Sequence, residues 1–128
     1  MPDLVFADGI LARIRARNGC RYDERAYLFV LAAIEYLQFK LDVRRHVTGN
    51  ELAWACRDLA FDRFGLLARP VLGCWGIAST ADFGAIVFTL ISVELLSAQA
   101  DDKESDFVSV YQFDDAFDHG YAIGRWSA

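Results

Sequence analysis

Residues 74–88 read Cys-Trp-Gly-Ile-Ala-Ser-Thr-Ala-Asp-Phe-Gly-Ala-Ile-Val-Phe, and they predict a tight turn followed by the most apolar helix of the chain. Gly76 suits the left-handed conformation just beyond the end of a preceding helix. Ser79 or Thr80 is a typical N-cap for the next helix. Asp82 then lies in the first helical turn, where free N–H groups favour a negative charge.

The helix that follows is predicted over 80–95 and is apolar on most of its circumference. Its first stripe has the helical spacing i, i+3, i+4, i+7 and consists of Phe83, Ile86, Val87 and Leu90. Such a helix is buried on most sides, so we expect the other segments to pack around it. Gly84 lies on a second apolar stripe although glycine is a poor helix former, which predicts close approach of another backbone.

Helical patterns also fill most of the chain before residue 80. The sequence Thr48-Gly49-Asn50-Glu51 has the spacing of a reciprocal capping box, which marks the start of a helix. We therefore predict a mainly α, single-domain bundle over 1–128, with about five helices around a buried central one. The helices are predicted over 4–17, 23–41, 49–64, 66–75 and 80–95.

The pattern changes after the central helix. Residues 107–113 are rich in β-branched and aromatic side chains, which favours a strand or an irregular segment that anchors aromatics on the core. As a strand, 107–113 would pair with 95–98 in a small antiparallel β-hairpin whose tip is an acidic loop. Three helices followed by such a hairpin would resemble a winged-helix domain in the order of elements.

Several short segments of the sequence, spread over roughly residues 20–117, together resemble a small family of uncharacterised bacterial proteins of about 130–150 residues. The resemblance supports a single domain and implies no activity. It rests on Arg21-Tyr22, Ala26-Tyr27-Leu28-Phe29-Val30, His46-Val47-Thr48-Gly49-Asn50-Glu51-Leu52, Phe64-Gly65, Trp75-Gly76, residues 79–88 and residues 106–113.

Composition limits the classes of function. The chain has 128 residues, of which 55% are hydrophobic, so it is long enough for one domain with a sizeable core. No apolar run is long enough to span a bilayer, and the start of the sequence lacks a signal-peptide pattern. We therefore expect a cytoplasmic protein with no membrane partner.

The net charge of −5 is unevenly distributed. Residues 1–100 hold 11 acidic and 11 basic side chains, so the whole excess lies in 101–128. The predicted wing, 101–106, would bring four carboxylates and one lysine to DNA phosphates, which a DNA-binding surface has to neutralise. We expect no nucleic-acid partner. The alternative, a winged-helix nucleic-acid-binding regulator, requires a basic N-terminal face built from Arg13 to Arg25 with Arg44 and Arg45.

The three cysteines, Cys20, Cys56 and Cys74, form no C-x-x-C pair. We interpret them as buried reduced thiols. With only two histidines in the chain, they also make a weak case for zinc. We therefore predict no metal site.

Pairs of titratable side chains occur one helical turn apart. Asp58 with Asp62 would be a candidate for acid–base chemistry, and His119 lies close to Asp115 and Asp118. Such pairs are more often solvated helix faces or local ion pairs. We predict no catalytic residue and no cofactor, and we favour a protein that is not an enzyme.

The best candidate for a binding cluster is Arg44, Arg45 and His46, which precedes a capped helix start whose N–H groups also favour an anion. The chain also has more large apolar side chains than a small core hides. We therefore predict a cytoplasmic protein–protein interaction module that binds another protein or itself. The surplus residues are Phe6, Tyr22, Phe39, Trp54, Phe61, Tyr111, Phe117, Tyr121 and Trp126.

Overall fold

The computed structural model describes residues 9, 12–14, 16, 21–41, 43, 47–93, 95–96, 103–113 and 117. This part of the chain is mainly helical, as the sequence predicts. Its α-helices are α2 (Glu24–Lys40), α3 (Gly49–Phe64), α4 (Ala68–Cys74) and α5 (Thr80–Ser92), and its 3₁₀ helices are η1 (Gly65–Leu67) and η2 (Glu104–Phe107). The helix predicted over 4–17 lies largely outside the described residues.

Helix α3 begins and ends at signals that the sequence carries. The Thr48 hydroxyl accepts a hydrogen bond from the Glu51 backbone N–H at 3.1 Å, and the Glu51 carboxylate accepts one from the Thr48 N–H at 2.9 Å. This is the predicted capping box. At the other end, Gly65 leaves the helical conformation with φ of 55°, which glycine adopts without a steric penalty.

The turn between α4 and α5 closes as a Schellman motif. The Ile77 N–H donates to the Leu72 carbonyl at 2.9 Å, and the Gly76 N–H donates to the Gly73 carbonyl at 3.0 Å. Gly76 has φ of 93°, which confirms the left-handed conformation predicted for it. Leu72 and Ile77 are both buried, and this apolar contact commonly accompanies the motif.

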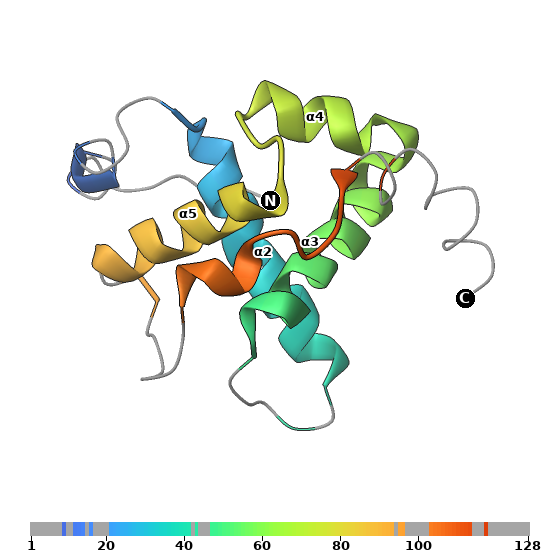
Figure 1. Cartoon of the computed structure of the whole chain (residues 1–128), viewed down its shortest axis with the longest axis horizontal. Coiled ribbons are helices and arrows are strands. Elements are labelled where there is room, and N and C mark those ends of the chain that lie inside the picture. The colour runs from blue at the N-terminus through green and yellow to red at the C-terminus, as the bar shows by residue number, and fades with distance from the viewer. Residues whose placement is uncertain are drawn as a thin grey trace.

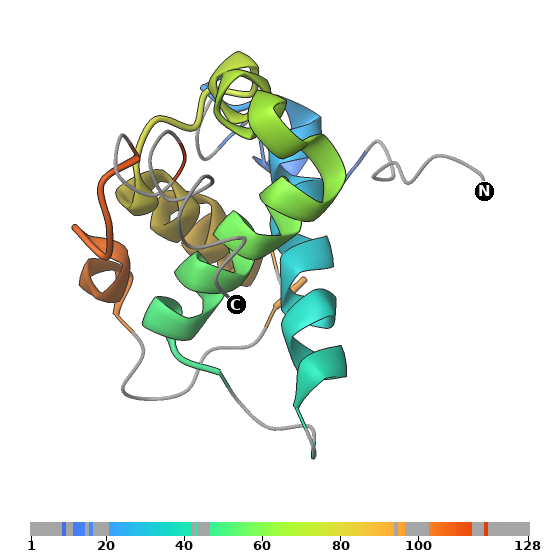
Figure 2. The same cartoon turned by 90° about the vertical axis from the view of Figure 1, so that its right-hand side faces the viewer.

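Helix α5 packs mainly against α2 and η2. Helix α2 packs on one side of it and η2 on the other, while α3 returns alongside α2 (Figure 1). Helix α4 lies across the end at which α2 begins and α3 ends (Figure 2). Of the residues in α5 only Ser92 is exposed, so the predicted burial of this helix is confirmed. It ends at Ser92, earlier than predicted.

The predicted β-hairpin is wrong within the residues that the structure describes, 95–96 and 103–113. They contain η2 and turns but no strand. The Val110 N–H donates to the Thr80 hydroxyl on α5 at 3.2 Å rather than to a neighbouring strand, and Ser109 has φ of 56°, which breaks an extended chain. Phe107 and Phe113 bury their rings in the core. The aromatic pattern therefore reflects anchoring on helices, the other alternative that the sequence left open.

Candidate functional site

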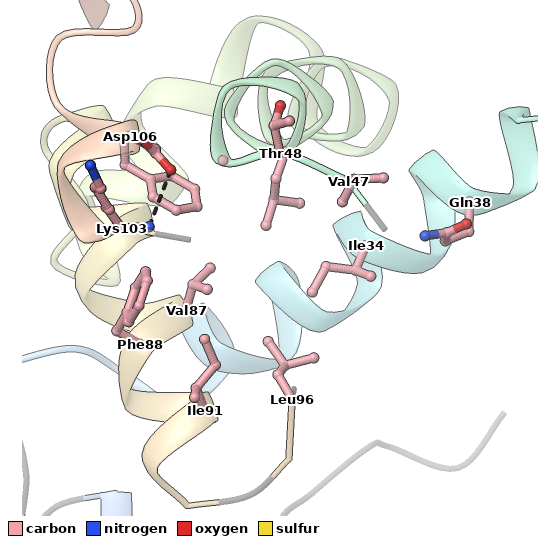
Figure 3. A pocket seen from close by; sticks show the side chains of 13 residues that line it. Ile34, Gln38, Val47, Thr48, Val87, Phe88, Ile91, Leu96, Lys103 and Asp106 are labelled. Carbon is pink, nitrogen blue, oxygen red and sulfur yellow. Dashed lines mark hydrogen bonds between the residues drawn. The ribbon is translucent and has the colours of Figure 1, made fainter. Parts of the chain in front are cut away.

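A pocket of about 130 Å³ opens between α2, the start of α3, α5 and η2 (Figure 3). A dry cavity of about 150 Å³ lined by Leu, Ile and Phe holds a benzene molecule, so this pocket has room for one apolar group of nearly that size. Most of its lining is apolar and consists of Ile34, Val47, Leu52, Val87, Phe88, Ile91, Leu96 and Phe107.

Phe107 reaches the wall of this pocket because two glycines leave room for its side chain. A Cβ added to Gly49 would stand 2.9 Å from Phe107 Cε2, and one added to Gly84 would stand 2.9 Å from Phe107 Cβ. Both distances are far inside the optimal separation of nonbonded carbons. The close approach predicted at Gly84 is therefore real, but the Phe107 side chain makes it rather than a backbone.

The polar residues of the pocket lie at its edge. On η2 the Asp106 carboxylate accepts a hydrogen bond from the Lys103 backbone N–H at 3.2 Å, and both side chains are exposed (Figure 3). Gln38 comes from α2 on the opposite side, and Thr48 uses its hydroxyl in the capping box of α3. These groups leave the interior of the pocket apolar.

This lining favours burial of an apolar group over a chemical reaction. The described residues that line the pocket include no histidine, cysteine or serine, and their only ionisable side chains are Lys103 and Asp106. The Asp106 carboxylate is already engaged by a backbone N–H. Among the described lining residues there is therefore neither a nucleophile paired with a base nor a pair of carboxylates, which are the usual requirements of hydrolytic sites.

A second polar cluster surrounds Asp82, which is 7% exposed at the start of α5. Its Oδ1 accepts hydrogen bonds from the Tyr22 hydroxyl at 2.5 Å and from Arg21 Nη2 at 3.2 Å. Its Oδ2 accepts from the backbone N–H groups of Ala78 at 2.8 Å and Ser79 at 3.1 Å. Burial, together with the hydrogen bond to Asp82, raises the pKa of Tyr22. The cluster thus joins the segment before α2 to the start of α5.

A third cluster lies on the surface of α3. Trp54 is 36% exposed, and its ring contacts the Tyr111 ring at 4.6 Å between centroids and the Arg57 guanidinium at 4.7 Å. Arg57 Nη2 also forms an ion pair with the Asp58 carboxylate at 2.9 Å. Asp58 is thus a partner in a local ion pair.

The other predicted site residues fall outside the part of the chain that the structure describes. They are Arg44, Arg45, His46 and His119. Val47, the next residue after the basic cluster, lines the pocket. The anion or partner site predicted at Arg44 to His46 therefore stays a prediction.

Sequence reasoning also missed the pocket itself. Its walls come from segments that are distant in sequence, such as Ile34 on α2 and Phe107 on η2. The usable signal was the pair Gly49 and Gly84, each of which lies in a helix where alanine would be favoured unless another group approached closely.

The interpretation of all cysteines as buried thiols is only partly right. Cys56 is buried, but Cys74 at the end of α4 is exposed, and Cys20 lies outside the described residues. The outer surface of the short α4 leaves Cys74 uncovered, since α4 buries only Ala68 and Leu72. Burial also raises the pKa of the Cys56 thiol, which disfavours the reactive thiolate.

We therefore expect a Cys20→Ser variant to have one fast-reacting thiol in the native state. Cys74 should react with a soluble aromatic disulfide within the mixing time, while Cys56 should react only after unfolding in urea. The measurement is the absorbance of the released thiolate with and without urea. Two thiols that react equally fast in the native protein would contradict the burial of Cys56.

Helix α5 is the one that would lie in the DNA major groove if the chain acted as a winged helix. A recognition helix has to present an exposed face to base edges. Only Ser92 of α5 is exposed, and η2 packs on the helix. The described part of the chain therefore gives no support to the nucleic-acid alternative.

Comparisons of the chain with protein-family models, with curated proteins and with solved structures gave no match. The resemblance to small bacterial proteins of about this length thus stays a prediction from the sequence. None of the described helices has the length and apolar character that crossing a membrane requires.

Proposed function

We propose that this chain is a non-enzymatic protein-binding module, and that the pocket between α2, α3, α5 and η2 receives one apolar side chain of a partner. The observation that carries the proposal is an open apolar pocket of about 130 Å³ whose polar residues lie at its edge. Partner side chains that fill such pockets supply most of the binding energy of many interfaces, and a polar rim surrounds them.

Exposed apolar side chains elsewhere give weaker support, and they are only in part the ones that the sequence singles out. Tyr22, Phe61 and Phe117 are buried in the core, whereas Phe39 is 90% exposed. Leu66 is 77% exposed and was not expected at the surface. Because these positions lie on different helices, the pocket is the better candidate for the centre of an interface.

Filling the pocket should separate binding from folding. Ile91 is half-buried on α5 and lines the pocket, so Ile91→Trp places a large ring in the empty volume. We expect the free energy of unfolding in urea to stay the same or to rise, because a filled void gains contacts. Peptides selected from a random display library on the wild-type protein should bind the variant at least about tenfold more weakly, as expected when an anchor side chain loses its pocket.

The matched control is Leu66→Trp, which adds the same side chain at an exposed position outside the pocket. It should keep the affinity of the wild-type protein for each peptide. Failure of the wild-type protein to select any peptide would contradict the proposal. So would selected peptides that bind the Ile91→Trp protein as tightly as the wild type.

A further inference from the structure

We propose that the pocket receives the Phe39 side chain of a second copy of this chain, and that two copies insert Phe39 into each other's pocket. This inference rests on the proposed function and names the partner. It starts from Phe39 in the last turn of α2, which is 90% exposed, more than any other large apolar side chain that the structure describes. Such a ring gains hydrophobic free energy when a partner covers it.

The pocket suits a phenylalanine ring in size and in chemistry. It measures about 130 Å³, and an apolar cavity of about 150 Å³ holds one benzene molecule. Phe88 and Phe107 are among the described lining residues, and aromatic rings attract each other beyond the burial of their area. Phe88 is half-buried, and Figure 3 shows its ring among the side chains around the pocket. An inserted ring therefore finds enough volume and aromatic neighbours.

Phe39 lies next to the pocket of its own chain without lining it. The preceding residue, Gln38, is a lining residue, whereas Phe39 is not. Because consecutive Cα atoms are about 3.8 Å apart, Phe39 belongs to the surface that borders the pocket. A two-fold axis near this end of α2 brings Phe39 of each copy towards the pocket of the other. The contact is then made twice, as in other two-fold interfaces.

Exposed apolar side chains extend the contact surface beyond the pocket. Leu95 and Val108 are both exposed, and each directly adjoins a lining residue in the chain, Leu96 and Phe107 respectively. The described lining contains one lysine and one aspartate, so the argument for a second copy comes from shape and apolar surface rather than from charge.

The first test is the mass of the full chain in light scattering over a concentration series. We expect the wild-type protein to dimerise as its concentration rises. Phe39→Ser removes the inserted ring at an exposed position, and Ile91→Trp fills the pocket. Each should weaken dimerisation at least about tenfold, as expected when an anchor side chain or its pocket is lost. The controls Leu66→Ser and Leu66→Trp change an exposed residue outside the pocket and should keep the dimer.

A mixture of the two variants is the decisive measurement. In a mixed dimer, Phe39 of the Ile91→Trp chain meets the open pocket of the Phe39→Ser chain, which restores one of the two contacts. An equimolar mixture should therefore have a higher average mass than either variant alone at the same total concentration. A mixture no heavier than its components would overturn the reciprocal insertion. So would wild-type assemblies that grow beyond two chains, because a two-fold contact closes on itself.

The outcomes separate this inference from the function on which it rests. A wild-type protein that stays monomeric, or a dimer that neither variant weakens, would overturn the inference. Pocket-dependent peptides, which bind the wild-type protein but not the Ile91→Trp protein, would then leave the docking function standing. A monomer that also selects no such peptide would overturn both. If Phe39 occupies the pocket, these peptides should compete with it and dissociate the wild-type dimer.

Discussion

Asp82→Ala is expected to lower the free energy of unfolding by about 3–5 kcal/mol, because it removes a buried carboxylate and leaves the buried Tyr22 hydroxyl and two part-buried backbone N–H groups without their acceptor. The Asp82 carboxylate accepts from the Tyr22 hydroxyl, from Arg21 and from the N–H groups of Ala78 and Ser79. The Arg21 side chain is largely exposed and returns to water, but the Tyr22 hydroxyl is buried in the core. The measurement is a urea melt at neutral pH.

Two matched variants locate the source of that loss. Asp58→Ala removes a carboxylate that is paired only with its neighbour Arg57 in the ion pairs described, and it should cost less than about 1 kcal/mol. Tyr22→Phe removes one hydrogen bond to a charged acceptor and should cost about 1.5–3 kcal/mol. Asp82→Ala and Asp58→Ala with equal costs would show that the buried network around Asp82 does not stabilise the fold.

The importance of Asp82 was not visible in the sequence. Its position three residues after Ser79 predicts a charge in the first turn of a helix, which is worth roughly 0.3–1 kcal/mol. The larger contribution comes from Arg21 and Tyr22, about sixty residues earlier in the chain. No local pattern relates residues so far apart, so sequence reasoning underestimates any side chain whose partners lie in another element.

Local signals, by contrast, were sufficient for the helix ends. The Thr48 and Glu51 capping box and the left-handed Gly76 depend only on residues within a few positions of each other. The strand predicted for 107–113 was wrong because the elements that pack on this segment lie elsewhere in the chain. Its β-branched and aromatic residues indicate a half-buried surface, and in the described structure helices α3 and α5 provide the buried side rather than a second strand.

The pocket, too, could be predicted from the sequence only in part. Its lining side chains could be assigned to buried helix faces from the sequence, but the empty volume between them depends on how α2, α5 and η2 approach one another. The sequence pointed instead to Arg44, Arg45 and His46, because a run of charge is visible without a structure. Gly84 was the one residue for which the sequence predicted a close approach at the site. Its substitution is the second change for which we expect a large loss of stability.

Gly84→Leu is expected to cost about 3–5 kcal/mol, similar to the loss of a buried phenylalanine, because the new side chain must displace Phe107. A Cβ at this position would stand 2.9 Å from the Phe107 Cβ, and a Cβ at Gly49 would stand 2.9 Å from Cε2 of the same ring. Phe107 is 3% exposed, so η2 has to move with it. A urea melt measures the loss, and the pocket-dependent peptides should lose their affinity because η2 forms one wall of the pocket.

The control for helix propensity is Gly73→Ala, since an added Cβ at Gly73 meets nothing within 4 Å. It should stabilise the protein by about 0.5–1 kcal/mol, the usual preference of a helix for alanine over glycine. The decisive step is a double-mutant cycle with Phe107→Ala, which empties the space that the introduced leucine would need. In that background Gly84→Leu should be neutral or stabilising, because the leucine fills the void. Additive costs would mean that Gly84 and Phe107 are not coupled, and that the close packing between them does not explain the glycine.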